Sequence, residues 1–153
     1  MKTVYWDANV FHALFNEEPN RIEACSRIET AARNNEVQIY TSAISFVECV
    51  RLKGRARLDP ANKEKIAKYF DHRFIRIVAC DRLIGESARE LLWHYEHLEY
   101  MDAIHVATAI FARVDILHTY DNDDLVRISE QVGAPPLKIS NPAWEETPPL
   151  PLE

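Results

Sequence analysis

The segment YMDAIHVATAIFARVDILHTYDNDD, residues 100–124, places acidic side chains at both ends of an apolar helix–strand pair. It opens with Asp102 and then stays apolar for most of twelve residues, which predicts a buried helix. Residues 116–119 predict a short buried strand. Three acids follow this strand: Asp121, Asp123 and Asp124. Carboxylates crowded at the edge of a core are costly unless a cation or another partner compensates them, so the segment predicts an acidic site on an α/β unit.

Length and composition predict a single globular domain. The chain has 153 residues, of which 47% are hydrophobic and 27% are charged, and this is ordinary for a soluble domain. The net charge of −6 argues against a general affinity for nucleic acid or an anionic membrane, although a local basic patch is compatible with it. No apolar run approaches the ~18 residues of a membrane-spanning helix, and the N-terminus does not resemble a signal peptide. Three widely spaced cysteines suit reduced thiols and a cytoplasmic location.

Strands and helices alternate along the chain. Strands are predicted at residues 3–6, 37–40, 74–78, 116–119 and 137–140. Helices are predicted at residues 10–15, 21–33, 44–52, 60–69, 82–97, 102–112 and 124–131. This alternation predicts an α/β fold with a central, mostly parallel five-stranded sheet flanked by helices on both faces. The domain is expected to span residues 1–140. A proline-rich tail, either held by Trp144 or frayed, is expected at 141–153.

Four acids stand where a predicted strand ends or within a helix that follows one. They are Asp7, Glu48, Asp102 and Asp121, with Asp124 behind them. Asp7 follows the first strand, at the sheet edge where α/β folds place their sites, but its position also suits a helix N-cap. If the first and fourth strands are neighbours, the acids that follow them converge. Carboxylates grouped in this way suit Mg²⁺ or Mn²⁺, which can activate water for attack on a phosphodiester.

Two other clusters can be interpreted either as ordinary structural features or as functional sites. The densest positive run consists of Arg51, Lys53, Arg55 and Arg57. It predicts a solvated helix end, and the alternative is contact with the phosphate backbone of RNA. His94 and His97 could share a helix face, but no matching ligand completes a zinc site. The three glycines form no phosphate-binding loop.

The order of these motifs resembles that of PIN-domain nucleases. The segments that carry the likeness are YWDANVF, TSAISFVECV, YMDAIHVATA and TYDNDD, and the likeness extends from residue 3 to about residue 140. It implies a three-layer PIN-like fold and cleavage of single-stranded RNA by a metal-activated water. By position, Asp7, Glu48, Asp102 and Asp121 would form the catalytic, Mg²⁺- or Mn²⁺-binding quartet. Thr119 would orient a neighbouring carboxylate and Asp124 would support the quartet from behind.

The small size is similar to that of VapC-type toxins of toxin–antitoxin pairs, which implies a homodimer silenced by an antitoxin protein. Two features depart from the family: Leu125 stands where Phe is frequent, and the likeness does not explain the tail after Pro142. Three other interpretations remain at this stage. The chain could be a catalytically silent PIN-type module that binds RNA or protein, or a housekeeping RNA-processing nuclease. A phosphotransfer domain with Asp7 as nucleophile is the third, although no D-x-D follows the first strand.

Overall fold

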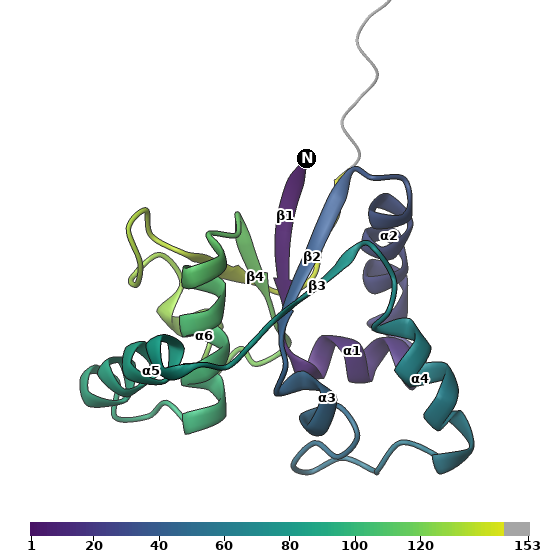
Figure 1. Ribbon diagram of the computed structural model, residues 1–153, viewed down its shortest axis with the longest axis horizontal. Coiled ribbons are helices and arrows are strands. Elements are labelled where there is room, and N and C mark those ends of the chain that lie inside the picture. The colour runs from purple at the N-terminus through teal and green to yellow at the C-terminus, as the bar shows by residue number, and fades with distance from the viewer. Residues whose placement is uncertain (146–153) are drawn as a thin grey trace, which may run out of the picture.

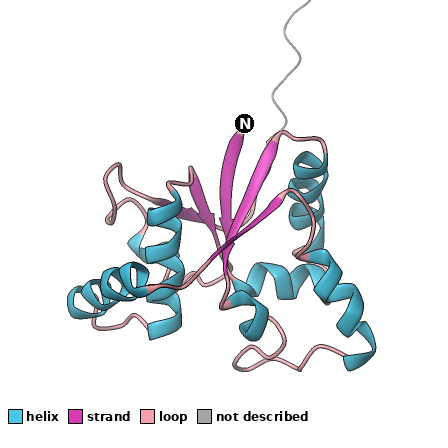
Figure 2. Cartoon of the chain, viewed as in Figure 1, coloured by secondary structure: helices cyan, strands magenta, loops and turns pink. Residues whose placement is uncertain are grey.

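The protein is an α/β domain built on one parallel sheet, described by a computed structural model for residues 1–145 (Figures 1 and 2). The strands are β1 (Lys2–Trp6), β2 (Val37–Ser42), β3 (Ile75–Val78), β4 (Ile116–His118) and β5 (Lys138–Ser140). The α-helices are α1 (Ala8–Phe15), α2 (Ile22–Arg33), α3 (Ser45–Glu48), α4 (Lys63–Tyr69), α5 (Arg82–His94) and α6 (Tyr100–Ala112). Two 3-10 turns, η1 (Pro60–Asn62) and η2 (Val126–Ile128), complete the described elements. The five predicted strands and the predicted layers are confirmed.

The sheet has the strand order β3-β2-β1-β4-β5, and every pairing is parallel. β1 is the central strand and pairs with β4 in the register Val4↔Ile116 to Trp6↔His118. The first and fourth strands are therefore neighbours, as their order in the chain allowed. Parallel strands end at the same edge, so the residues that follow β1 and β4 meet there.

Side chains alternate between two cores on opposite faces of the sheet. Val4 and Trp6 face α1, α2 and α4, whereas Tyr5 and Leu117 face α5 and α6. Figure 1 shows these two groups of helices on either side of the strands. Burial on both faces explains why the strands read as nearly continuous apolar runs. None of the described helices is both long and apolar enough to cross a membrane.

The helix predicted at 124–131 is wrong. Only the 3-10 turn Val126–Ile128 forms there, and Glu130 adopts a left-handed φ of 62°. The Glu130 amide then donates to the Leu137 carbonyl at 2.8 Å, which directs the chain toward β5. The prediction relied on an acid that could cap a helix and on Gly133 as its stop, and a compact turn that buries Leu125 and Ile128 suits the same residues.

Two other helices are shorter than predicted. The helix expected at 44–52 is the four-residue α3, because β2 continues to Ser42 and the chain turns after Glu48. Val47, within this short helix, is 76% exposed. The helix expected at 82–97 ends at His94, since Tyr95 is extended.

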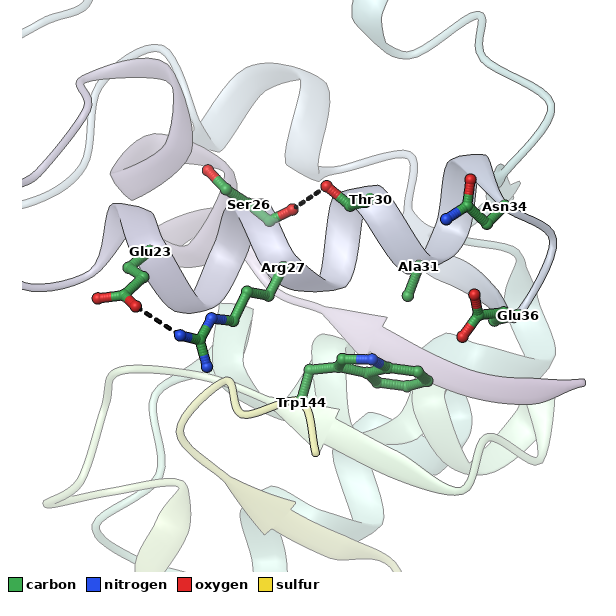
Figure 3. A pocket seen from close by; sticks show the side chains of 8 residues that line it. All are labelled: Glu23, Ser26, Arg27, Thr30, Ala31, Asn34, Glu36 and Trp144. Atoms are coloured by element: carbon green, nitrogen blue, oxygen red, sulfur yellow. Dashed lines mark hydrogen bonds and ion pairs between the residues drawn. The ribbon is translucent and has the colours of Figure 1, made fainter. Parts of the chain in front are cut away.

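The first residues of the predicted tail pack against α2. The Trp144 side chain contacts the core on this face of the sheet, and the Lys2 ammonium lies 5.3 Å from its ring centroid. Figure 3 shows the indole beneath α2, in a pocket that Arg27, Ala31 and Glu36 also line. The part of the predicted tail from residue 146 onward lies outside the described residues.

The core on the α5 and α6 face gives a stability prediction. Leu117→Ala is expected to lower the free energy of unfolding by about 3 kcal/mol, because Leu117 is fully buried and its truncation leaves a cavity. Leu83→Ala is the matched control, since Leu83 is 55% exposed and should change stability by less than about 0.5 kcal/mol. Urea unfolding followed by circular dichroism measures both, and equal losses in the two variants would contradict this assignment of the core.

Candidate functional site

A cleft of about 340 Å³ lies at the carboxyl ends of β1 and β4. The four predicted acids and Asp124 all line it, so residues distant in the sequence converge here. The other lining residues are Ala8, Asn9, Leu52, Lys53, Arg55, Glu99, His105 and Tyr120. The order of the strands is what brings the acids together, because Asp7 follows β1 and Asp121 follows the neighbouring β4.

Three of these acids are close enough to share one cation. Asp102, Asp121 and Asp124 each offer a carboxylate oxygen, and these atoms lie within 4.8 Å of one another. Asp102 is in the first turn of α6. The Asp124 amide donates to Asp121 Oδ1 at 2.9 Å, which holds the loop after β4 in a tight turn. Asp124, expected behind the quartet, therefore lies within this group.

Asp7 lies deeper, between β1 and α1. It is 3% exposed and occupies the N-cap position of α1, but its side chain makes no capping hydrogen bond. Thr119 Oγ1 donates to Asp7 Oδ2 at 2.5 Å, and the orienting role that the family resemblance implied for Thr119 stays a prediction. The other oxygen, Oδ1, is buried without a hydrogen-bond partner among the described residues. A buried carboxylate oxygen without a hydrogen-bond partner is chemically suited to bind a cation.

Glu48 reaches the cleft from the end of α3. His105 Nε2 donates to Glu48 Oε1 at 2.6 Å. His105 is one turn beyond Asp102 on α6, and its Nδ1 lies 2.7 Å from the Tyr5 hydroxyl. The side chain of Glu48 is 22% exposed and that of His105 is 2% exposed, so the pair forms the inner wall of the cleft.

The crowding changes the acidity of these groups. Burial, reinforced by the charges of Asp121 and Asp7, raises the pKa of Asp102 to about 7. Burial raises the pKa of Asp7 to about 6, against the opposing effects of His105 and Thr119. Burial alone would lower the pKa of His105, but the hydrogen bond to Glu48 and the surrounding carboxylates raise it above its ordinary value. Without a cation in the cleft, Asp7, Asp102 and His105 therefore bind protons more readily than the same groups do in water.

The predicted basic cluster is divided by the structure. Lys53 and Arg55 line the cleft, where Lys53 Nζ lies 3.6 Å from Glu99 Oε1. Arg55 forms an ion pair with Glu18. Arg51 is exposed, and Arg57 lines a separate apolar groove that contains Phe46 and Phe70.

His105 and Asn9 belong to the site but were not predicted from the sequence. Asn9 donates to Thr119 Oγ1 at 3.2 Å and accepts a hydrogen bond from the Tyr120 amide at 2.9 Å. The sequence gives only a weak indication of each residue, namely its spacing from a predicted acid. His105 follows Asp102 by three positions in an otherwise apolar helix, and Asn9 follows Asp7 by two.

The sequence model of the PIN domain matches residues 4–131, which is well over half of the chain. The chain belongs to the PIN domain family. A search of curated proteins gave no match.

The PIN fold is shared with solved structures of low sequence identity. VapC20 of Mycobacterium tuberculosis, described as a sarcin-ricin loop cleaving toxin, is 20% identical, with a TM-score of 0.63 over 78% of this chain and 91% of its own. VapBC2 of Rickettsia felis, bound to a DNA fragment from their promoter, is 18% identical, with a TM-score of 0.66 over 94% and 99%. A toxin–antitoxin complex from Klebsiella pneumoniae is 21% identical, with a TM-score of 0.58 over 82% and 92%. At these identities the likeness shows the fold alone.

The raised pKa values give a pH prediction for the metal-free PIN domain. Asp7, with a pKa of about 6, and Asp102, with a pKa of about 7, bind protons more tightly in the folded state than in the unfolded state. The difference matters at pH values between the ordinary pKa of an aspartate and these raised values. The carboxyls therefore contribute less stability as the pH rises from about 4 to about 7. In EDTA at pH 8, Asp102→Asn is expected to be more stable than the parent by roughly 1 to 2 kcal/mol, because it removes a repelled charge.

The difference between the two proteins should shrink on acidification to about pH 4, where the carboxyl is protonated in both states. Chemical unfolding at several pH values measures it. Asp123→Asn is the matched control, since Asp123 is an exposed acid in the same loop. An Asp102→Asn variant no more stable than the parent at pH 8 would contradict the crowding of charge in the cleft.

Proposed function

We propose that this PIN domain is a metal-dependent endoribonuclease that cleaves single-stranded RNA and serves as the toxin of a type II toxin–antitoxin pair. The observation that carries the proposal is the convergence of the four predicted acids and Asp124 on one cleft, which Glu99 also lines. At a separation of about 4.8 Å, two ionised carboxylates repel by roughly 3 kcal/mol for an effective dielectric constant of about 20. A doubly charged cation removes this cost.

Asp102, Asp121 and Asp124 would hold Mg²⁺ or Mn²⁺, with Asp7 and Glu48 completing the set directly or through water. Hard oxygen donors suit these ions, and three oxygens within 4.8 Å support a shared ligand set. When bound, the ion supplies an activated water and neutralises charge that develops on the phosphodiester. Thr119 fixes Asp7 through its hydrogen bond, so the carboxylate keeps one orientation.

The substrate would approach along the loop that follows α3. An acidic cleft repels RNA, and Lys53 and Arg55 at its wall are the cations placed to offset this repulsion. Arg51, exposed on the same loop, would extend the contact along the phosphate backbone. Arg57 lies over the apolar groove, and its contact with RNA stays a prediction.

The toxin assignment is supported by the fold. Among the solved structures of similar fold are a VapC toxin and toxin–antitoxin complexes. By this analogy the partners would be an RNA substrate, a second copy of the chain and a cognate antitoxin, in the cytoplasm. No second function is favoured by a separate observation.

Cleavage of RNA is the first test of the proposal. The purified protein is expected to cut a fluorescent single-stranded RNA with Mg²⁺ or Mn²⁺ and to stop with EDTA. Asp102→Asn should reduce the rate at least about 100-fold, because it removes a preorganised charge at the reacting centre. Asp123→Asn is the control and should keep the parent rate. Cleavage by Asp102→Asn at the parent rate would remove the nuclease assignment.

Growth of the expressing cell tests the toxin role separately. Expression is expected to arrest growth, Asp102→Asn should relieve the arrest, and co-expression of the gene beside it should also relieve it. The relieving gene product should co-purify with this chain as a complex. If the protein has RNase activity but is harmless at a high level, it is a housekeeping RNA-processing enzyme, and the toxin label is withdrawn.

A further inference from the structure

A continuous hydrogen-bonded chain runs from the sheet to the wall of the cleft. The Ser42 amide at the end of β2 donates to the Tyr5 hydroxyl at 3.1 Å. The hydroxyl lies 2.7 Å from His105 Nδ1, and His105 Nε2 lies 2.6 Å from Glu48 Oε1. Tyr5 is fully buried and His105 is 1% exposed, so water does not compete for these bonds.

The partners fix the direction of the bond to Glu48. A carboxylate accepts, so His105 Nε2 carries the hydrogen that Glu48 receives, whether the ring is neutral or charged. The Tyr5 oxygen accepts from the Ser42 amide. With a neutral ring its O–H donates to His105 Nδ1 and selects the tautomer whose N–H is directed at Glu48; with a charged ring Nδ1–H donates to the phenol oxygen and Nε2–H still donates to Glu48. The Tyr5 and His105 rings also pack edge to face, with centroids 5.7 Å apart and planes at 68°, which fixes the imidazole plane.

Glu48 needs such a support because its own element is weak. It is the last residue of α3, a helix of four residues whose neighbours Phe46 and Val47 are exposed. The hydrogen bond to His105 occupies Oε1 and leaves the second oxygen for the cleft. His105 shares α6 with Asp102, so a single rigid helix places both the ligand-bearing Asp102 and the support of Glu48.

We infer that His105 is a positioning residue for Glu48, that Tyr5 orients His105, and that this pair presents the Glu48 carboxylate to the divalent cation. The inference rests on the proposed function, since it concerns the same metal site. It also gives β1 a second role in the site: Asp7, which follows the strand, contributes a carboxylate, and Tyr5, two residues earlier, orients another. The alternative is that His105 is a buried histidine that merely satisfies Tyr5.

A double-mutant cycle on Mn²⁺ affinity tests the inference. Calorimetric titration of the full chain with Mn²⁺ alone is expected to show binding that His105→Leu weakens by about 10- to 100-fold, the usual effect of losing a ligand's hydrogen-bond partner. His105→Gln should restore much of the affinity, because its amide can donate from a similar position. In a Glu48→Ala background, His105→Leu should have no further effect, since the carboxylate it positions is gone.

Tyr5→Phe gives the second arm of the test. It keeps the buried ring and removes only the hydroxyl, so it should weaken Mn²⁺ binding in the parent background but not in Glu48→Ala, even if His105→Leu does not fold. The matched controls are Tyr40→Phe, a half-buried tyrosine of β2, and His94→Leu, an exposed histidine of α5; both should leave the affinity unchanged. If Tyr5→Phe weakens binding equally with and without Glu48, the roles of Tyr5 and His105 are only structural and the inference is overturned. Absence of Mn²⁺ binding by the parent overturns the proposed function and the inference together.

Discussion

Repulsion between carboxylates is the constraint on which the site of this PIN domain depends. The parallel sheet creates it, because β1 and β4 are neighbours and both deliver an acid to the same edge. The fold cannot relieve the repulsion by separating the acids without giving up this pairing. Burial and the neighbouring charges instead raise the pKa of Asp102 to about 7, and burial raises that of Asp7 to about 6, so both carboxyls bind protons more readily than an exposed acid, and a cation would compete with those protons. Stability and metal binding are therefore linked through the same few charges.

Neutral and donating side chains hold this charged array in place. Thr119 is the hub on the β4 side, since it donates to Asp7 and accepts from Asn9 and from the Asp121 amide. His105 has the corresponding place on the α6 side. Each donor is fixed by the sheet or by a buried helix rather than by a surface loop. Orientation of the acids is thus determined by the core, although the acids themselves line a cleft.

The sequence was sufficient to predict the sheet and the convergence of the acids, because the strands and helices alternate regularly along the chain. Buried parallel strands produce apolar runs, and an acid that ends such a run falls at the sheet edge whatever the details of the loops. The prediction of helix 124–131 failed because a capping acid and a later glycine also fit a compact turn. Glu48 was identified but not its support, because a hydrogen bond between residues 57 positions apart leaves no local pattern. Asp124 was placed behind the quartet for a similar reason, since its position depends on a turn closed by the Asp121 side chain.

The basic loop beside the cleft shows how an acidic protein can place cations at the wall of an acidic cleft. The loop has no helix of its own after α3, yet it is tied to the α1–α2 connection. Glu18 forms ion pairs with Arg55 and, at 3.1 Å, with Arg21, while the buried His12 donates to the Ala56 carbonyl at 3.3 Å. Burial lowers the pKa of His12, so the imidazole is neutral and this bond does not add to the charge of the loop. Glu18 therefore holds the guanidinium of Arg55 at the wall of the cleft. Lys53 is exposed and its ion pair with Glu99 is weak, so its side chain can change orientation at little cost.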